Sequence, residues 1–189
     1  WTVRDMLTGI TGEEFTISGI DTLFFAVPFE VESDFFIPEC EFAAFVDNGS
    51  EHIIFQGAHG ELPMPPYYFF IENELTHMLA APGEEVEFCI PACNYGSSGD
   101  TIDIHLEVDA PEEWTVMGCT PEYCFISDAS MYVESESAGT LKVHIYSDES
   151  VVGTGSANVT FTSRASGRRY EIEDSLSTGG PVLVCLLYT

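Results

Sequence analysis

The chain has 189 residues, 45% hydrophobic and 13% aromatic, which is enough apolar side chain for a sizeable core and unlike a disordered chain. Its 32 Asp and Glu against 5 Lys and Arg give a formal net charge of −27. This balance excludes nucleic acids and anionic membranes as partners, because both are bound through clustered cations. Only Arg164, Arg168 and Arg169 lie close together in the sequence.

Six cysteines in an acidic chain are typical of an exported protein, since disulfides persist outside the cell. The first residue is Trp1 rather than Met, and we expect a mature extracellular or cell-surface chain from which a signal or propeptide has been removed. The sequence has no apolar run of about 18 residues, the length that predicts a membrane-spanning helix.

Short apolar runs bounded by Gly, Pro, Asn or Ser predict β-strands along most of the chain. In chain order they are residues 23–29, 41–46, 52–56, 67–71, 85–90, 101–108, 141–147, 157–164 and 182–187. Three of them alternate apolar and polar residues, the pattern of a half-buried strand. The residues expected to face inward are Ile102, Ile104, Leu106, Val108, Leu141, Val143, Ile145, Val159 and Phe161.

Residues 73–81 are the one segment expected to be helical. Leu75, Met78 and Leu79 have helical spacing there, and Pro82-Gly83 is a stop signal. The same turn signal predicts a boundary between residues 1–81 and residues 82–189. The first part is an N-terminal β region that forms its own small domain or adds strands to the sandwich of the second.

Residues 82–165 carry an ordered succession of motifs. Pro82-Gly83 opens a strand, an N-x-G-x-x-x-D turn follows at Asn94, Gly96 and Asp100, and P-x-x-W occurs at Pro111 and Trp114. A C-x4-C pair and a Gly-bearing strand pair complete it. This succession resembles the Ig-like, fibronectin-type-III-like accessory modules of secreted prokaryotic surface proteins. The resemblance implies an all-β, Ig-like antiparallel sandwich and a non-catalytic spacer, adhesion or assembly module.

The cysteines are expected to form disulfides. A Pro turn between Cys119 and Cys124 can bring their Cα atoms within the roughly 4.4–6.8 Å that a disulfide needs. Cys89 and Cys93 are expected to pair in the same way, which leaves Cys40 for Cys185. The alternative, metal binding by thiolates, is disfavoured because neither spacing has a nearby His in zinc-finger register.

No nucleophile elbow, P-loop, HExxH or EF-hand motif occurs, so we expect no enzyme activity and no cofactor. The five histidines form no i, i+4 pair, and His105 and His144 can share a metal only if their strands are adjacent. Calcium is the one cation considered possible, at the oxygen-rich loops 47–51 and 94–100. Two sequons predict N-glycosylation, at Asn48 and Asn158.

The ends of the chain point to self-association. Residues 1–20 form a β-capable arm flanked by glycines, and residues 182–187 are an unbroken apolar strand. We expect a subunit of an extracellular filament, pilus-like fibre or surface layer, in which one arm adds a strand to the next copy. The alternatives are a monomeric secreted adhesion module, binding surface glycans through Tyr67, Tyr68, Tyr123 or Tyr146, and a secreted hydrolase with an unrecognised site.

Overall fold

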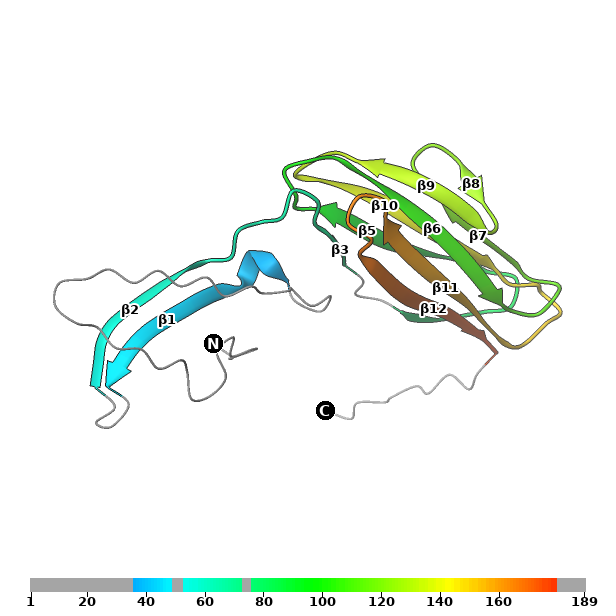
Figure 1. The fold of residues 1–189 in the computed structure, drawn as a ribbon. Helices are drawn as coiled ribbons and strands as arrows, with labels where there is room; N and C mark the ends of the chain where they lie inside the picture. The colour runs from blue at the N-terminus through cyan, green and yellow to red at the C-terminus, as the bar shows by residue number, and fades with distance from the viewer. Residues whose placement is uncertain (1–35, 49–52, 73–75, 180–189) are drawn as a thin grey trace, which may run out of the picture. The chain divides into compact units, whose positions relative to one another are not determined.

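The computed structural model describes residues 36–48, 53–72 and 76–179, and Figure 1 shows its fold. In this part of the chain two five-stranded sheets form a sandwich. The first sheet has the order β3-β5-β10-β7-β8 and the second has the order β4-β12-β11-β6-β9. The prediction of an all-β, Ig-like sandwich with extra N-terminal strands is confirmed.

The strands of the first sheet are β3 (Phe69–Ile71), β5 (Glu85–Asn94), β10 (Ser137–Tyr146), β7 (Thr115–Cys119) and β8 (Cys124–Phe125). Those of the second are β4 (His77–Ala80), β12 (Arg169–Thr178), β11 (Thr154–Ser163), β6 (Asp100–Asp109) and β9 (Asp128–Val133). All neighbouring strands are antiparallel except β12 and β4, which are parallel.

The core lies between the sheets and follows the period-two alternation of the sequence. Leu141, Val143 and Ile145 of β10 are fully buried, as predicted, and so are the inward residues of β11. Val108 is the exception, because it is 46% exposed. β9 pairs only with residues 100–105 of β6, so Val108 lacks a neighbouring strand on that side.

The helix predicted over residues 73–81 is wrong where the structure describes that segment, because His77–Ala80 form β4. β3 and β4 lie on either side of residues 73–75 and belong to different sheets, so the chain changes sheet between them. Both strands precede the turn at Ala81, Pro82 and Gly83, and that turn leads from β4 in the second sheet to β5 in the first. Within the described residues before Pro82, β3 and β4 are the strands that belong to the sandwich.

A two-stranded hairpin precedes the sandwich in the chain. It consists of β1 (Glu41–Asn48) and β2 (Ile53–Glu61), and in it Phe42 lies opposite Gly60. A Cβ atom on Gly60 would lie 2.9 Å from the Phe42 ring, so the ring covers the glycine backbone. Before β1, the short 3-10 helix η1 (Ile37–Glu39) is anchored by Ile37, whose N–H donates to the Tyr68 hydroxyl at 3.1 Å.

Asn94, at the end of β5, holds the turn that the N-x-G-x-x-x-D pattern marks. Its Nδ2 donates to the carbonyl oxygens of Ser98 and Val133, at 3.0 and 3.2 Å, and its Oδ1 accepts the Gly96 N–H at 2.9 Å. Val133 belongs to β9, so this one side chain links the two sheets. Gly96 is required because a Cβ there would lie 2.3 Å from the Pro66 carbonyl oxygen.

Asp100, the last residue of the same pattern, binds the loop between β11 and β12. Its carboxylate is buried and accepts hydrogen bonds from the Ser163 hydroxyl and, at 3.3 Å, from the Ala165 N–H. The two polar ends of the pattern therefore hold the start of β6 against β9 on one side and against the β11–β12 loop on the other. Among the described residues no helix is long and apolar enough to cross a membrane.

The turn gives a test of the fold. Replacing Asn94 with Ala leaves two carbonyl oxygens and one N–H without their partner in a buried position, and we expect the free energy of unfolding to fall by about 2–3 kcal/mol. Chemical denaturation measures it. Asn158→Ala is the control: its side chain is exposed, and we expect a change within about 0.5 kcal/mol. Equal stabilities of the two variants would contradict the role of Asn94.

Candidate functional site

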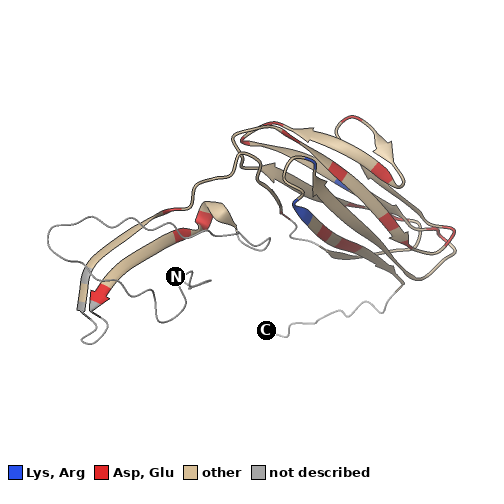
Figure 2. Cartoon of the chain, viewed as in Figure 1, with Lys and Arg blue, Asp and Glu red and all other residues tan. Residues whose placement is uncertain are grey.

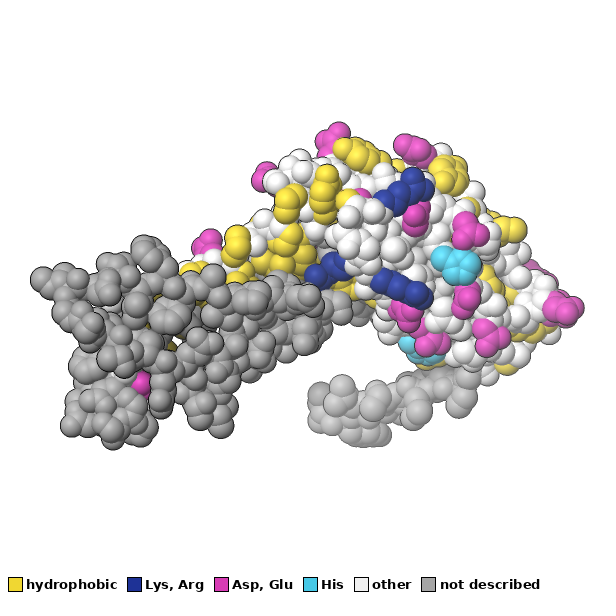
Figure 3. Space-filling view, viewed as in Figure 1, with side chains coloured by type: hydrophobic (Ala, Val, Ile, Leu, Met, Phe, Trp, Pro, Cys, Tyr) yellow, Lys and Arg dark blue, Asp and Glu magenta, His cyan; other side chains and the backbone are white. Residues whose placement is uncertain are grey.

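The outward side chains of β6, β11 and β12 form one continuous polar surface, which we call the polar face. The inward positions of these strands hold mainly apolar core residues, so the alternation places hydroxyl, amide and charged groups outside. Figure 3 shows this face, and Figure 2 shows how acidic residues dominate the charges on the sandwich. Its members are Asp103, His105, Glu107, Thr154, Ser156, Asn158, Thr160, Thr162, Arg169, Glu171 and Glu173.

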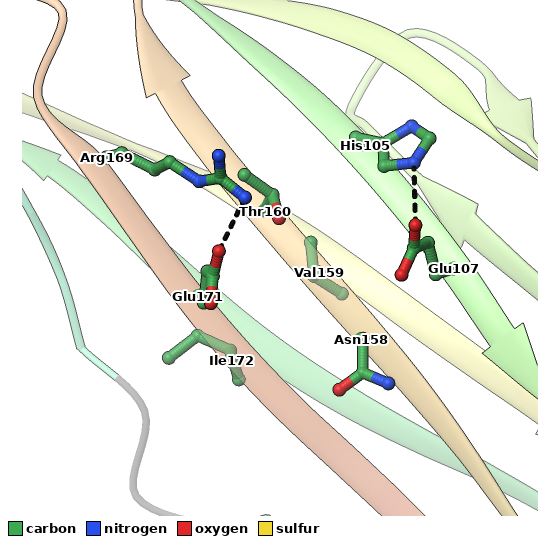
Figure 4. Close-up of a pocket in the computed structure, with 8 residues that line it drawn as sticks. All are labelled: His105, Glu107, Asn158, Val159, Thr160, Arg169, Glu171 and Ile172. Atoms are coloured by element: carbon green, nitrogen blue, oxygen red, sulfur yellow. Dashed lines mark hydrogen bonds and ion pairs between the residues drawn. The ribbon is translucent and has the colours of Figure 1, made fainter.

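His105 lies on β6, between β11 and β9. Its Nδ1 is 2.8 Å from Oδ1 of Asp128 on β9, and its Nε2 is 3.6 Å from Oε1 of Glu107 (Figure 4). The hydrogen bond with Asp128 is the main reason that the pKa of His105 is raised, and the same bond lowers the pKa of Asp128. The imidazole is therefore held in its charged form to a higher pH than a free histidine.

The arginines do not form the cluster that their spacing in the sequence indicates. Arg164 binds Asp103 with two nitrogens, at 2.7 and 3.0 Å, and Arg169 pairs with Glu171 (Figure 4). Arg168 instead lies 4.6 Å from the centre of the Tyr68 ring. Each guanidinium has its own partner, so in the described part of the chain they do not converge on one anion site.

Two adjoining depressions of the polar face share His105 and Thr160. Figure 4 shows the larger, where Asn158 and Thr160 lie between the His105–Glu107 and Arg169–Glu171 pairs. Its carboxylates can accept hydrogen bonds and its amide and hydroxyl can both donate and accept. This arrangement suits a neutral ligand rich in hydroxyl groups.

A second cluster lies on the outer face of the first sheet, where β5 and β10 are neighbours. The Lys142 ammonium is 2.9 Å from Oε1 of Glu87, and the His144 Nδ1 is 2.7 Å from Oε1 of Glu85. The Cys89 thiol donates to Glu87 at 3.4 Å. The hydrogen bond from Lys142 is the main cause that lowers the pKa of Glu87. The pKa of Cys89 is raised, mainly by burial and next by its hydrogen bond to Glu87.

One predicted disulfide is confirmed, a second pairing is wrong, and the third falls partly outside the described residues. Cys119 and Cys124 lie opposite each other on β7 and β8 and are bonded, with Cα atoms 3.9 Å apart. Cys89 and Cys93 are free thiols of one strand, and four residues of extended chain separate their Cα atoms by about 13 Å. The predicted pairing of Cys40 with Cys185 stays a prediction, because Cys185 lies outside the described part of the chain.

The histidines and the candidate metal loops do not come together. His105 belongs to the second sheet and His144 to the first, so they cannot share an ion. The described residues contain no group of three His, Cys, Asp or Glu side chains placed to hold a metal. In loop 94–100 the Asn94 side chain is committed to the turn, and residues 49–52 lie outside the description. Calcium binding therefore stays a prediction.

The asparagines predicted to carry glycans and the tyrosines predicted to bind them lie on different elements of the structure. Asn158 is exposed on the polar face, whereas Asn48 ends β1 next to residues that the structure does not describe, so occupancy of either sequon stays a prediction. Tyr68 is only 2% exposed and cannot stack on a sugar, which corrects that assignment. Tyr67, Tyr123 and Tyr146 are exposed but lie on different elements.

Sequence reasoning missed the part of the polar face that comes from β12, and the partner of His105 on β9. A signal was present in residues 169–178, where Tyr170, Ile172 and Leu176 alternate with polar residues. Asp174 interrupts that alternation, because it is a charged residue at a fully buried position. The partner of His105, Asp128, could not be found without knowing that β9 pairs with β6.

No known protein family and no curated protein matches the chain. The N-terminal domain of PorA is similar in structure at 14% identity, over 60% of this chain and 98% of that chain, with a TM-score of 0.48. The CARDB domain of a Pyrococcus furiosus protein is similar at 9% identity, over 62% and 94% of the two chains, with a TM-score of 0.41. A FixG-related protein from Vibrio parahaemolyticus follows at 12% identity, over 62% and 100%, with a TM-score of 0.38.

The His105–Asp128 pair predicts a pH dependence. His105 titrates above its ordinary pKa of about 6.5, so its favourable pairing is complete below that pH and is lost as the pH rises through the raised pKa. At the acid end the pairing is lost as the pH falls through the lowered pKa of Asp128. NMR titration of the His105 ring measures the first step. Asp128→Asn should lower its midpoint, and an unchanged midpoint would contradict the assignment.

Proposed function

We propose that the chain is a non-catalytic module of an extracellular surface structure, and that copies of it associate by β-strand addition. The observation that carries the proposal is the outer edge of β5. β3 pairs only with residues 92–94 of this ten-residue strand, so its first part has no neighbouring strand on that side among the described residues. An edge of this kind is a template for another chain.

The direction of the backbone groups defines this edge. The Pro91 carbonyl oxygen accepts the Glu72 N–H at 3.0 Å on the β3 side. Backbone groups alternate in direction along a strand, so those of Cys89, Glu87 and Glu85 point to the same side. We call these three residues the β5 edge. An incoming strand could bond to each of them in turn.

The side chains of the β5 edge favour such a contact. The Glu87 carboxylate already has a cationic neighbour in Lys142, which compensates part of its charge, and the Glu85 carboxylate is hydrogen-bonded to His144. On the inner face of the strand, Phe88 and Ile90 belong to the core, and an added strand would extend this apolar layer. Residues 1–20 and 182–187 have the apolar content expected of a donor.

Net charge sets the conditions for association. Two copies with a formal charge of −27 repel each other at low ionic strength. Salt reduces this repulsion because the Debye length falls from about 30 Å at 0.01 M to about 3 Å at 1 M. Donor arm and acceptor edge are different surfaces, so repeated addition would build an open filament. An extracellular medium that is saline or contains divalent cations supplies the screening.

Replacing Cys89 with Pro tests the acceptor edge. Proline removes the N–H that points to the open side and leaves the bonds to β10 in place. Pro91 has the same orientation and is already accommodated in this strand. In sedimentation velocity at high salt we expect the parent protein to form oligomers and Cys89→Pro to remain monomeric.

Cys89→Ser is the matched control, because it also removes the thiol but keeps the N–H, and it should assemble like the parent. Denaturation curves of both variants show whether the sandwich is intact. Assembly of Cys89→Pro to the extent of the parent would show that β5 is not the acceptor. A parent protein that stays monomeric at every salt and calcium concentration would overturn the proposal itself.

The polar face supports a second candidate function, adhesion to neutral glycans. Asn158 and Thr160 lie between carboxylates there, which suits hydroxyl-rich ligands and repels anionic ones. A glycan array should show binding of neutral but not sulfated sugars. Thr160→Val keeps the shape of the side chain and removes its hydroxyl, and it should weaken binding about tenfold. Equal binding by the variant would exclude this face as the site.

A further inference from the structure

The side of the sandwich opposite the β5 edge is formed by β8 and β9. β8 has only two residues, Cys124–Phe125, which is too short to template a strand. β9 has six residues, Asp128–Val133, and among the strands that the structure describes it pairs with β6 alone. Without further protection, β9 would present a second acceptor edge.

Tyr123 covers the middle of the β9 edge. Its hydroxyl accepts the Ser130 N–H at 3.3 Å and lies 3.5 Å from the Ser130 carbonyl oxygen, to which it donates. One phenol thus satisfies both backbone groups that Ser130 would offer to a neighbouring strand. Backbone groups alternate along β9, so Asp128, Ser130 and Tyr132 face this edge and Ser130 is the central one.

The position of Tyr123 is set by the disulfide loop. The Cys119–Cys124 bond closes the turn between β7 and β8. Within it the Thr120 N–H donates to the Tyr123 carbonyl oxygen at 2.9 Å, and the Thr120 hydroxyl accepts the Tyr123 N–H at 3.3 Å. Backbone, side chain and covalent bond all fix the residue that carries the phenol.

Asp128 and Tyr132 are the edge positions on either side of Ser130. Asp128 places a carboxylate next to the first edge position, and that carboxylate is bound to His105. At the other end the Tyr132 ring lies over Gly99, where a Cβ would come within 2.1 Å of the hydroxyl oxygen. An added strand would need the central position, where the Tyr123 hydroxyl already occupies both backbone groups of Ser130.

We infer that the Cys119–Cys124 loop closes the β9 edge through Tyr123, so that a strand from a second copy is not added on the side of the sandwich formed by β8 and β9. We call the hydrogen bonds of Tyr123 to Ser130 the cap. The part of the inference that concerns second copies rests on the proposed function, whereas the cap itself does not. A subunit with one acceptor edge builds an unbranched chain. A subunit with two acceptor edges would allow branching and lateral aggregation.

Hydrogen exchange of Tyr123→Phe tests the cap. This variant removes only the hydroxyl from a side chain that is 45% exposed, so the fold is expected to persist. We expect the Ser130 amide to exchange about two- to tenfold faster, the range that corresponds to loss of one ordinary hydrogen bond. Tyr67→Phe is the control, because that ring is 41% exposed and lies outside the loop. Its Ser130 exchange rate should equal that of the parent.

A double variant tests whether the cap prevents strand addition. Tyr123→Phe in the Cys89→Pro background has a blocked β5 edge and an uncapped β9 edge. In sedimentation velocity at high salt we expect it to regain oligomers that Cys89→Pro lacks, while Cys89→Pro with Tyr67→Phe stays monomeric.

The two measurements separate the possible failures. An unchanged Ser130 exchange rate in Tyr123→Phe would overturn the cap, whether or not the parent protein assembles. Faster exchange without regained oligomers would overturn the claim that the cap controls strand addition. If the parent never assembles but Tyr123→Phe does, the proposed function fails while the closure of β9 is supported.

Discussion

The two strands that begin the sandwich, β3 and β4, are both short and belong to different sheets. Much of the molecule's proposed behaviour depends on that constraint. β3 pairs with three residues of β5, and β4 pairs with four residues of β12. Because β5 and β12 each have ten residues, neither can be covered along its whole length. The uncovered backbone on this side contrasts with the other side, where a short strand, a disulfide loop and one phenol occupy the edge. The two sides therefore differ in chemistry although both end in edge strands.

The negative charge of the sandwich disfavours contact between copies through the faces of the sheets. Contact through the backbone of a strand edge is less affected. Lys142, Arg164 and Arg169 each bind a carboxylate on the same or a neighbouring strand. The remaining acids give both outer faces the same sign, so face-to-face contact between copies is unfavourable without screening. Hydrogen bonds along a strand edge depend much less on side-chain charge. A strongly acidic protein can thus associate through its edges while its faces keep neighbours apart.

Strand alternation made most of the sandwich predictable, and long-range pairing made the remainder unpredictable. Residues 101–108 and 141–147 alternate so regularly that both the strand and its inward residues follow from the sequence. Residues 77–80 were misassigned because a short apolar run with Met78 and Leu79 fits helical spacing as well as a strand. The contact between Asp128 and His105 depends on strand order. The distance between Cys89 and Cys93 depends instead on the length of β5, which contains both residues. Local spacing favoured their disulfide, but an extended strand holds them apart.

The free thiol on the β5 edge has a chemical consequence for the lifetime of the protein. Thiol oxidation and disulfide exchange proceed through the thiolate. Partial burial and the neighbouring Glu87 carboxylate raise the pKa of Cys89, so at neutral pH the sulfur stays protonated. An exposed cysteine in an oxidising environment would otherwise link neighbouring molecules at random. The carboxylate beside it therefore lowers the thiolate fraction of Cys89 and slows its oxidation and disulfide exchange.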